Sequence, residues 1–232
     1  GLETGATVVI EETADVLQTI DTAAGATLSI DVGATQAGSA GVTVTDAAIV
    51  TVTGKAATGN IQQLTLDAVD TTSLALATTS TNDLDTGAIT GTDQITSLTM
   101  TSAASGGTIS AASFADADSL TSITLTGVGG NITMVGATGT NGAGSAEELS
   151  TITATATAGS NIDLAGAITL DNVDTASGNL TTTITSSANG TDGTTDSSVA
   201  FGAMTSTYGA INATTSGDGL TTFDDIVAKG IT

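Results

Sequence analysis

Residues 120–134 read Leu-Thr-Ser-Ile-Thr-Leu-Thr-Gly-Val-Gly-Gly-Asn-Ile-Thr-Met, and this stretch decides the fold. Polar and apolar residues alternate from Ser122 to Thr126, as they do in a strand with one buried face. The glycine-rich turn 127–130 follows, and Asn131 opens a second short strand. Residues 149–164 repeat this arrangement, with a turn at Ala158-Gly-Ser and a second strand from Asn161 to Leu164. The sequence therefore predicts units of two short strands joined by a tight turn.

The opening pattern of that stretch recurs: an apolar residue, two polar residues, an apolar residue, then Thr or Asp. Copies begin at Leu17, Ile61, Ile95, Leu120 and Leu149, with a weaker sixth at Leu180, at intervals of 44, 34, 25, 29 and 31 residues. Recurrence at such intervals is typical of chains that stack coils.

The sequence therefore predicts an all-β fold, a parallel β-helix (β-solenoid) with short strands and irregular coil length. In that fold the first residues of the five clear copies would lie one above another. A tandem β-sandwich is the alternative, because alternation with a period of two does not distinguish parallel from antiparallel pairing.

The composition suits stacked strands. Hydrophobic residues make up 39% of the 232 residues but aromatic residues only 2%, so the interior must consist of Ile, Leu, Val, Ala and Thr methyl groups. Small and β-branched side chains pack well on pleated surfaces. Proline is absent, so no strand lacks a backbone donor.

Four regions are predicted along the chain. Residues 1–15 form an N-terminal cap or assembly segment, 16–185 the solenoid, 186–198 a low-complexity loop, and 199–232 a C-terminal cap or assembly segment. Helices are scarce, and the best candidate is Thr222–Lys229, which starts with acidic residues and is followed by Gly230.

The charge balance limits the partners. There are 24 acidic residues against two lysines, Lys55 and Lys229, and the formal net charge is −22. We expect no nucleic-acid partner, since no basic patch can form. No apolar run approaches the roughly 18 residues that can span a bilayer, so no transmembrane segment is expected.

An enzymatic role is not expected. The absence of His and Cys excludes Ser–His–Asp and Cys–His catalytic arrangements. Paired carboxylates could hydrolyse glycosides, but such sites use aromatic platforms for sugar rings, and the chain has only four aromatic residues.

Calcium is the metal that this composition favours, because Ca²⁺ takes six to eight oxygen ligands and needs no nitrogen or sulfur. Pairs of Asp fall mostly in predicted turns, where stacked coils would bring neighbouring pairs together. Turn capping by Asp side chains is the competing interpretation. The candidate ligands are Asp67, Asp70, Asp83, Asp85, Asp116, Asp118, Asp171, Asp174, Asp224 and Asp225.

Thr-x-Thr steps are frequent, as at Thr99/Thr101 and Thr124/Thr126. On a flat solenoid face, rows of such pairs can order water and bind ice. The irregular spacing of the copies favours another interpretation, in which these residues are simply the outward side chains of half-buried strands.

The chain resembles the repetitive parts of bacterial surface-layer (S-layer) proteins in three respects. These are the Leu-Thr-Ser-Ile-Thr-Leu-Thr-Gly copies, a composition dominated by Ala, Thr, Gly, Ser and Asp, and the lack of Cys, His and Arg. The resemblance is strongest to S-layer proteins that are exported by type I secretion, which fold as calcium-bound β-solenoids. Over residues 15–185, the resemblance implies a secreted, extracellular structural protein at the cell surface.

Such a protein would self-assemble with calcium into a surface layer or filament. Its partners would be copies of itself, with a cell-surface glycan as a further candidate partner. An adhesin or ice-binding solenoid module of a longer secreted protein is the alternative function.

Overall fold

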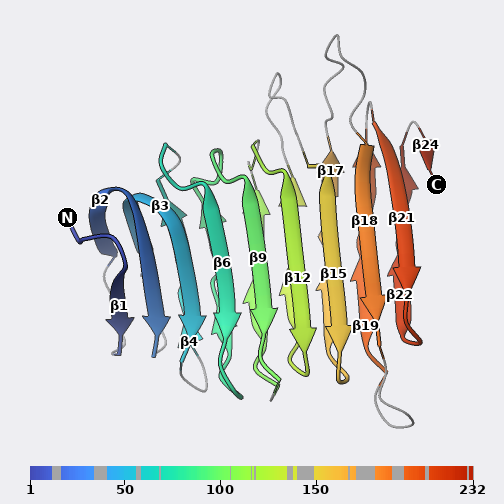
Figure 1. Ribbon diagram of the computed structural model, residues 1–232, viewed down its shortest axis with the longest axis horizontal. Helices are drawn as coiled ribbons and strands as arrows, with labels where there is room; N and C mark the ends of the chain where they lie inside the picture. Colours follow the sequence, from blue (N-terminus) through green and yellow to red (C-terminus); the bar gives the residue numbers. More distant parts are fainter. Residues whose placement is uncertain are drawn as a thin grey trace.

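The structure, a computed structural model, is all-β. It describes residues 1–11, 17–33, 41–55, 59–67, 69–104, 106–115, 117, 119–134, 138–139, 149–166, 168–170, 181–189, 196–206, 209–228 and 230–231. Strands account for 65% of the described residues, and no helix occurs among them. Figure 1 shows the strands stacked along one long axis, with the two termini at opposite ends.

Three ladders of strands run along this axis, and we name them A, B and C. Ladder A contains β1 (Ala6–Ile10), the second halves of β2 (Gln18–Val32) and β3 (Val42–Gly54), β6 (Ser73–Thr78), β9 (Ser97–Ser102), β12 (Ser122–Val128), β15 (Thr151–Thr157), β18 (Thr181–Ala188), β21 (Ala210–Ser216) and β24 (Gly230–Ile231).

Ladder B is a separate seven-stranded sheet. It contains β4 (Gly59–Asn60), β7 (Leu84–Asp85), β10 (Ile109–Ala111), β13 (Ile132–Met134), β16 (Asn161–Leu164), β19 (Ser198–Phe201) and β22 (Leu220–Phe223).

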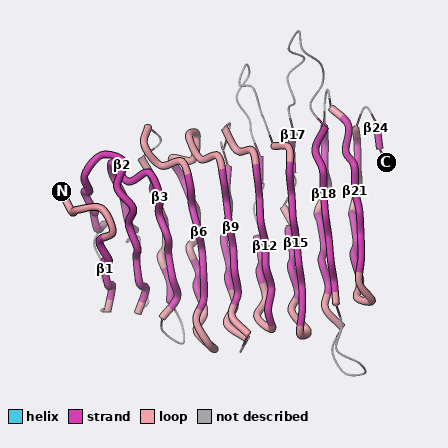
Figure 2. The backbone as a smooth tube through the Cα atoms, in the orientation of Figure 1, coloured by secondary structure: helices cyan, strands magenta, loops and turns pink. Residues whose placement is uncertain are grey.

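Ladder C contains the first halves of β2 and β3, β5 (Gln63–Leu66), β8 (Ala88–Thr90), β11 (Ser113–Ala115), β14 (Thr138–Gly139), β17 (Ile168–Leu170), β20 (Met204–Ser206) and β23 (Ile226–Val227). From β5 onward the chain visits ladders C, A and B in turn, so each coil has three strands. Ladders A and C form one 17-stranded sheet because β2 and β3 run continuously around the corner between them (Figure 2).

Every pairing between named strands is parallel, including the longest ones, β2–β3, β12–β15 and β18–β21. This confirms the β-solenoid and excludes tandem antiparallel sandwiches. The single antiparallel bridge among the described residues joins Gln63, the first residue of β5, to Gly87, which precedes β8.

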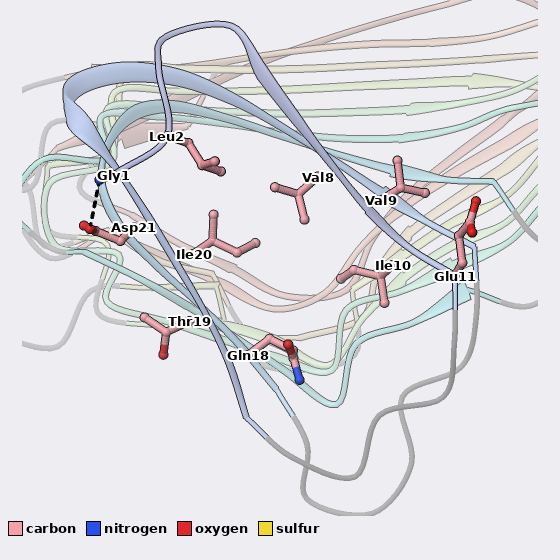
Figure 3. Close-up of a pocket in the computed structure, with 10 residues that line it drawn as sticks. All are labelled: Gly1, Leu2, Val8, Val9, Ile10, Glu11, Gln18, Thr19, Ile20 and Asp21. Atoms are coloured by element: carbon pink, nitrogen blue, oxygen red, sulfur yellow. Dashed lines mark ion pairs between the residues drawn. The ribbon is translucent and has the colours of Figure 1, made fainter.

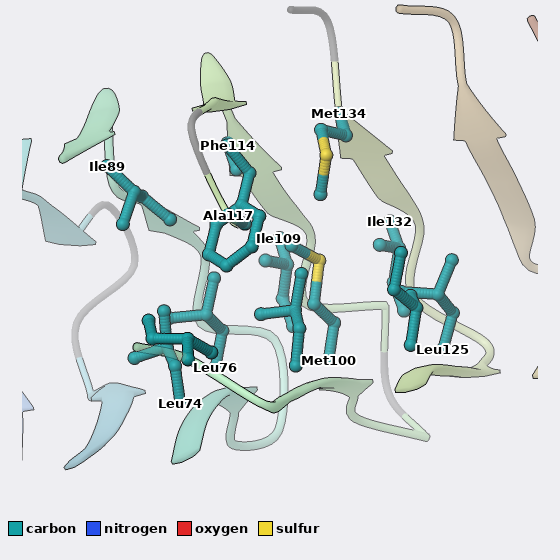
Figure 4. Packing of buried hydrophobic residues seen from close by; sticks show 14 of the residues in the cluster. Leu74, Leu76, Ile89, Met100, Ile109, Phe114, Ala117, Leu125, Ile132 and Met134 are labelled. Atoms are coloured by element: carbon teal, nitrogen blue, oxygen red, sulfur yellow. The ribbon is translucent and has the colours of Figure 1, made fainter. Parts of the chain in front are cut away.

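The core fills the centre of the coils with stacked apolar columns. In ladder A, alternate side chains point inward, and Leu76, Met100 and Leu125 succeed one another in one column with no or almost no exposed surface. Phe114 of β11 is the largest fully buried side chain and packs from ladder C (Figure 4). Alternation produces one buried face per strand, as expected for strands that cover a common interior.

Coil length varies while the register of ladder A is kept. Leu74, Leu98, Ile123, Ile152 and Ile184 occupy equivalent positions although they are 24, 25, 29 and 32 residues apart. The additional residues lie between strands, which agrees with the predicted irregular coil length.

The five motif copies do not all stack, so that expectation is partly wrong. Ile95, Leu120 and Leu149 are equivalent, because Thr121 N–H donates to Thr96 O (2.9 Å) and Ser150 N–H donates to Thr121 O (3.0 Å). The copy at Ile61 leads instead into ladder C, and Leu17 is exposed at the first coil. The pattern marks a corner followed by a strand, and a three-sided coil has three such corners.

The ladders extend into both terminal regions. β1 pairs with β2, and β22 and β23 pair with β19 and β20. The division into caps, solenoid and loop stays a prediction, and residues 190–195 of the predicted loop lie outside the described ranges. The expected helix at Thr222–Lys229 is wrong, because pairing with the preceding coil outweighs a short helical pattern that lacks tertiary support.

Candidate functional site

An acidic corner forms where the chain passes from ladder C to ladder A. Asp46 lies at the bend of β3 with φ of 65°, a left-handed conformation that Asp tolerates better than most residues. Asp67 and Asp70 lie in the turn after β5, one coil further on. This turn is closed by Thr71 N–H, which donates to Asp67 O (3.0 Å). Because β3 and β5 are neighbours in ladder C, stacking brings the two turns together.

Carboxylate oxygens of Asp46, Asp67 and Asp70 all lie within 4.8 Å of one another, and the three residues are half-buried. Three negatively charged oxygen ligands on one side suit a hard divalent cation such as Ca²⁺, whose remaining positions backbone carbonyls and water can fill.

Repulsion between the carboxylates destabilises the acidic corner when no cation is bound. The pKa of the Asp46 carboxyl lies above its ordinary value because partial desolvation disfavours the charged form, and Asp70 adds a hydrogen bond and repulsion in the same direction. Asp21, from the preceding coil, raises the pKa of Asp46 further. Asp21 itself accepts a hydrogen bond from Thr45 Oγ1 (3.1 Å) and pairs with the Gly1 amino group at 3.6 Å. A cation would relieve this repulsion.

The structure separates the other described candidate ligands from this corner. Asp83 Oδ1 accepts a hydrogen bond from Thr108 N–H (2.8 Å), and Asp85 Oδ1 accepts one from Gly87 N–H (3.0 Å). Both residues flank or belong to β7 in ladder B. Asp85 caps its own turn, as the competing interpretation holds, whereas Asp83 bonds to the backbone of the next coil. Asp224 and Asp225 are exposed after β22, and the structure does not bring them into a cluster of three or more acidic groups among the described residues.

Four candidate ligands, Asp116, Asp118, Asp171 and Asp174, lie outside the described residues. Asp46 was missed by the sequence reasoning, which sought pairs of acids. A signal was present, because Ile20-Asp21, Val44-Thr-Asp46 and Leu66-Asp67 each end a ladder C strand with an apolar residue followed closely by Asp.

A second feature is the open end of the core at the first coil. A hollow of about 1010 Å³ is lined by Gly1, Leu2, Val8, Val9, Ile10, Glu11, Gln18, Thr19, Ile20 and Asp21. Figure 3 shows Leu2, Val8 and Ile20 pointing toward one another across it. Within the described residues β1 pairs only with β2, so its other edge has no strand beside it.

Exposed apolar side chains concentrate at the two ends of the solenoid. Of the seven large hydrophobic residues that are exposed in the described part, five belong to the first or last coil: Leu2, Leu17, Val9, Leu220 and Val227. Phe223 and Ile226 are only partly buried against the core at the last coil. The ends therefore carry unpaired strand edges and accessible core side chains together.

No family model, curated protein or solved structure matches this chain. None of the described residues belongs to a helix long and apolar enough to cross a membrane.

Replacing Asp46 by Asn is expected to raise the melting temperature at pH 7 in the absence of divalent cations. The native state binds a proton at Asp46 more tightly than the unfolded chain does, so stability falls as pH rises from 3.8 through the raised pKa. Asn removes that penalty and tolerates the positive φ.

Thermal unfolding in EDTA at pH 3 and pH 7 measures this effect, and the difference between Asp46→Asn and wild type should vanish at the lower pH. Calcium should raise the melting temperature of wild type more than that of the variant, because a ligand stabilises only the state that binds it. Asp93→Asn, an exposed control outside the acidic corner and both ends, should show neither effect. A lower melting temperature for Asp46→Asn at pH 7 in EDTA would contradict the prediction.

Proposed function

We propose that this chain is a secreted, extracellular structural protein whose solenoids stack head to tail into a filament or surface layer. The observation that carries the proposal is that both ends expose unpaired strand edges of ladders A and C. The first coil offers edges of ladders A and C around an open core, and the last coil offers edges of all three ladders. Unpaired strand edges are templates for pairing with another chain.

The side chains at the two ends are complementary. Val8, Ile10 and Ile20 face the hollow at the first coil, while Phe223 and Ile226 cover the last coil only in part. Joining the ends of two copies would continue the core columns from one subunit to the next. A head-to-tail contact that does not close into a ring generates a filament.

Charge opposes this contact in the absence of cations. Glu3, Glu11 and Asp21 lie in the first coil, and Asp218, Asp224 and Asp225 lie in the last. Described ion pairs join Gly1 with Asp21 and Lys55 with Asp31. With 24 acidic residues against two lysines, cationic side chains can neutralise only a small part of the acidic charge. Repulsion between like charges keeps such surfaces apart until counter-ions neutralise them.

Calcium is therefore proposed as the assembly cofactor. It would act at the acidic corner of Asp46, Asp67 and Asp70 within a subunit and between the acidic ends of neighbouring subunits. The resemblance to bacterial surface-layer proteins supports a location at the cell surface, where a surface glycan is the proposed anchor.

Assembly can be tested by electron microscopy and sedimentation velocity of the purified chain. We expect filaments or sheets in millimolar CaCl₂, monomers in EDTA, and monomers in NaCl of equal ionic strength, which separates calcium binding from screening. A chain that stays monomeric in calcium would overturn the proposal.

A backbone variant identifies the contact. Ile10 O accepts a hydrogen bond from Gly33 N–H (2.7 Å), so the neighbouring residue Val9 directs its backbone groups to the open edge of β1. Val9→Pro removes the backbone N–H of residue 9, and proline is tolerated on an edge strand. The variant should therefore fold as a monomer but fail to assemble. Val9→Ala, which keeps the donor, should assemble like wild type. Equal assembly of both variants would show that β1 is not the contact.

A further inference from the structure

Between β9 and β18, three neighbouring outward columns of ladder A contain only Thr and Ser, and Val128 lies just beyond them at the end of β12. Three outward residues per strand on four neighbouring strands make twelve positions, which we call the hydroxyl face. They are Ser97, Thr99, Thr101, Ser122, Thr124, Thr126, Thr151, Thr153, Thr155, Thr183, Thr185 and Ser187. All twelve are half-buried or exposed, and the residues between them point into the core.

No charged residue interrupts this face, although the chain carries a net charge of −22. The nearest charges in the same outward columns among the described residues lie in earlier coils, at Asp31 of β2 and beside β3 at Lys55, and these two pair with each other at 3.9 Å. Ladder B, by contrast, carries Asp85 and Asp163 on its outer side. Among the described residues, the outer side of ladder A from β9 to β18 thus carries no acidic residue.

The Thr hydroxyls of the face are left without partners inside the described chain. None of its nine Thr residues makes a side-chain hydrogen bond to another described group. Hydroxyls elsewhere behave differently. At the corner before ladder A, Thr96 Oγ1 donates to Thr72 O (3.0 Å) and Thr121 Oγ1 donates to Thr96 O (2.9 Å). On ladder C, Thr90 Oγ1 donates to Thr65 Oγ1 (3.1 Å). Two Ser residues of the face do have partners, since Ser97 Oγ donates to Ser73 Oγ (3.0 Å) and Ser187 Oγ accepts from Asn189 Nδ2 (3.1 Å). The nine Thr hydroxyls therefore keep their donors and acceptors for something outside the chain.

The face is a regular two-dimensional grid. Register is unbroken from β9 through β12 and β15 to β18, although coil length changes, and Figure 1 shows these strands side by side in nearly one direction. Neighbouring strands lie about 4.8 Å apart and alternate residues about 6.6 Å apart along a strand. The irregular spacing of the sequence copies, which argued against a regular grid, resides in the connections and leaves this face unaffected.

We propose that the hydroxyl face binds ice. The repeat between neighbouring strands lies close to the shorter oxygen–oxygen repeat on the prism faces of hexagonal ice. Each Thr offers a hydroxyl that can take a lattice water position and a methyl group that keeps the intervening water ordered. A charged group would instead hold a strongly hydrated shell that does not fit the lattice, and the face has none. This role is independent of end-to-end assembly, because it uses the side of the solenoid.

Two other occupants fit less well. Polysaccharide sites generally stack sugar rings on aromatic side chains, and the face has no aromatic residue. A second copy packed face to face would bury Thr and Ser with few apolar groups larger than a methyl, a weak basis for a stable interface. Both are outcomes that the experiment below detects.

Thermal hysteresis and the partition of labelled protein into a slowly grown ice hemisphere test the proposal. Wild type should shape ice crystals and enter the ice, in EDTA as well as in calcium, which separates this result from assembly. Thr124→Lys and, independently, Thr153→Lys should lose most of the hysteresis and be excluded from ice. Both positions are on the surface, and circular dichroism should show an unchanged fold.

Thr133→Lys is the matched control, since Thr133 is half-buried on the outer side of β13 in ladder B. It should behave like wild type. Absence of hysteresis in wild type, or equal loss in the ladder A and ladder B variants, would overturn the proposal. So would self-association or binding to crystalline polysaccharide that Thr124→Lys alone abolishes, because the face would then have another occupant.

Discussion

Replacing Leu125 by Ala is expected to lower the free energy of unfolding by about 3 kcal/mol, within the range measured for buried Leu→Ala changes. Leu125 has no exposed surface and stacks between Met100 of β9 and Ala154 of β15. The neighbouring Ala154 is too small to fill the space, so the cavity should persist. Urea denaturation followed by circular dichroism measures the change.

The adjacent residue provides the control. Thr124 points outward from the same strand, so Thr124→Ala should change the free energy of unfolding by no more than about 0.5 kcal/mol. If the two substitutions cost the same, the alternation that defines the inner and outer faces of β12 would be wrong. A one-residue slip in register would even reverse the order of the two effects.

Replacing Gly91 by Ala adds only one methyl group, but we expect it to lower the free energy of unfolding substantially. Gly91 has φ of 70°, and a Cβ atom there would overlap the carbonyl oxygen of Leu66 in the preceding coil. The left-handed conformation costs an L-residue about 1–2 kcal/mol, and forcing the two coils apart adds about 1–3 kcal/mol. The same urea titration measures the sum.

Gly25→Ala separates the two contributions. Gly25 has φ of 74°, but a Cβ atom there has no neighbour within 4 Å. Its cost should therefore be limited to the conformational part, about 1–2 kcal/mol. Equal losses for Gly91→Ala and Gly25→Ala would mean that coils do not approach each other closely at Leu66.

The sequence predicted the architecture because the interior is built from simple alternation. Ile123 and Leu125, with Thr on either side, specify one buried face per strand, and the recurrence of that pattern specifies stacking. The sequence alone did not reveal at which of the three corners of the coil each copy of the motif lies. Ile61 and Ile95 begin similar patterns, yet they lead into ladders C and A, because a short strand after a corner has the same requirements on every side of the coil.

The candidate site was predicted in part. Asp67 and Asp70 were named from their place in a turn, but their partner Asp46 depends on register between coils, which local sequence does not contain. Asp83 and Asp85 were named on the same grounds, but Asp83 accepts a backbone hydrogen bond from the next coil and Asp85 caps its own turn. A short helix at Thr222–Lys229 was expected because local propensity was assessed without the coil beneath it, where Phe201 stacks on Phe223 with ring centroids 5.0 Å apart.

The freedom of the connections has a practical consequence. Only six residues separate β8 from β9 and β11 from β12, but eleven separate β14 from β15 and ten separate β17 from β18, while the strands on either side keep their register. The scaffold thus accepts inserted peptides at this corner without disturbing its packing. An epitope or enzyme tag grafted between β14 and β15 should be displayed on the flank of the rod, leaving its tips and its Thr-rich side untouched.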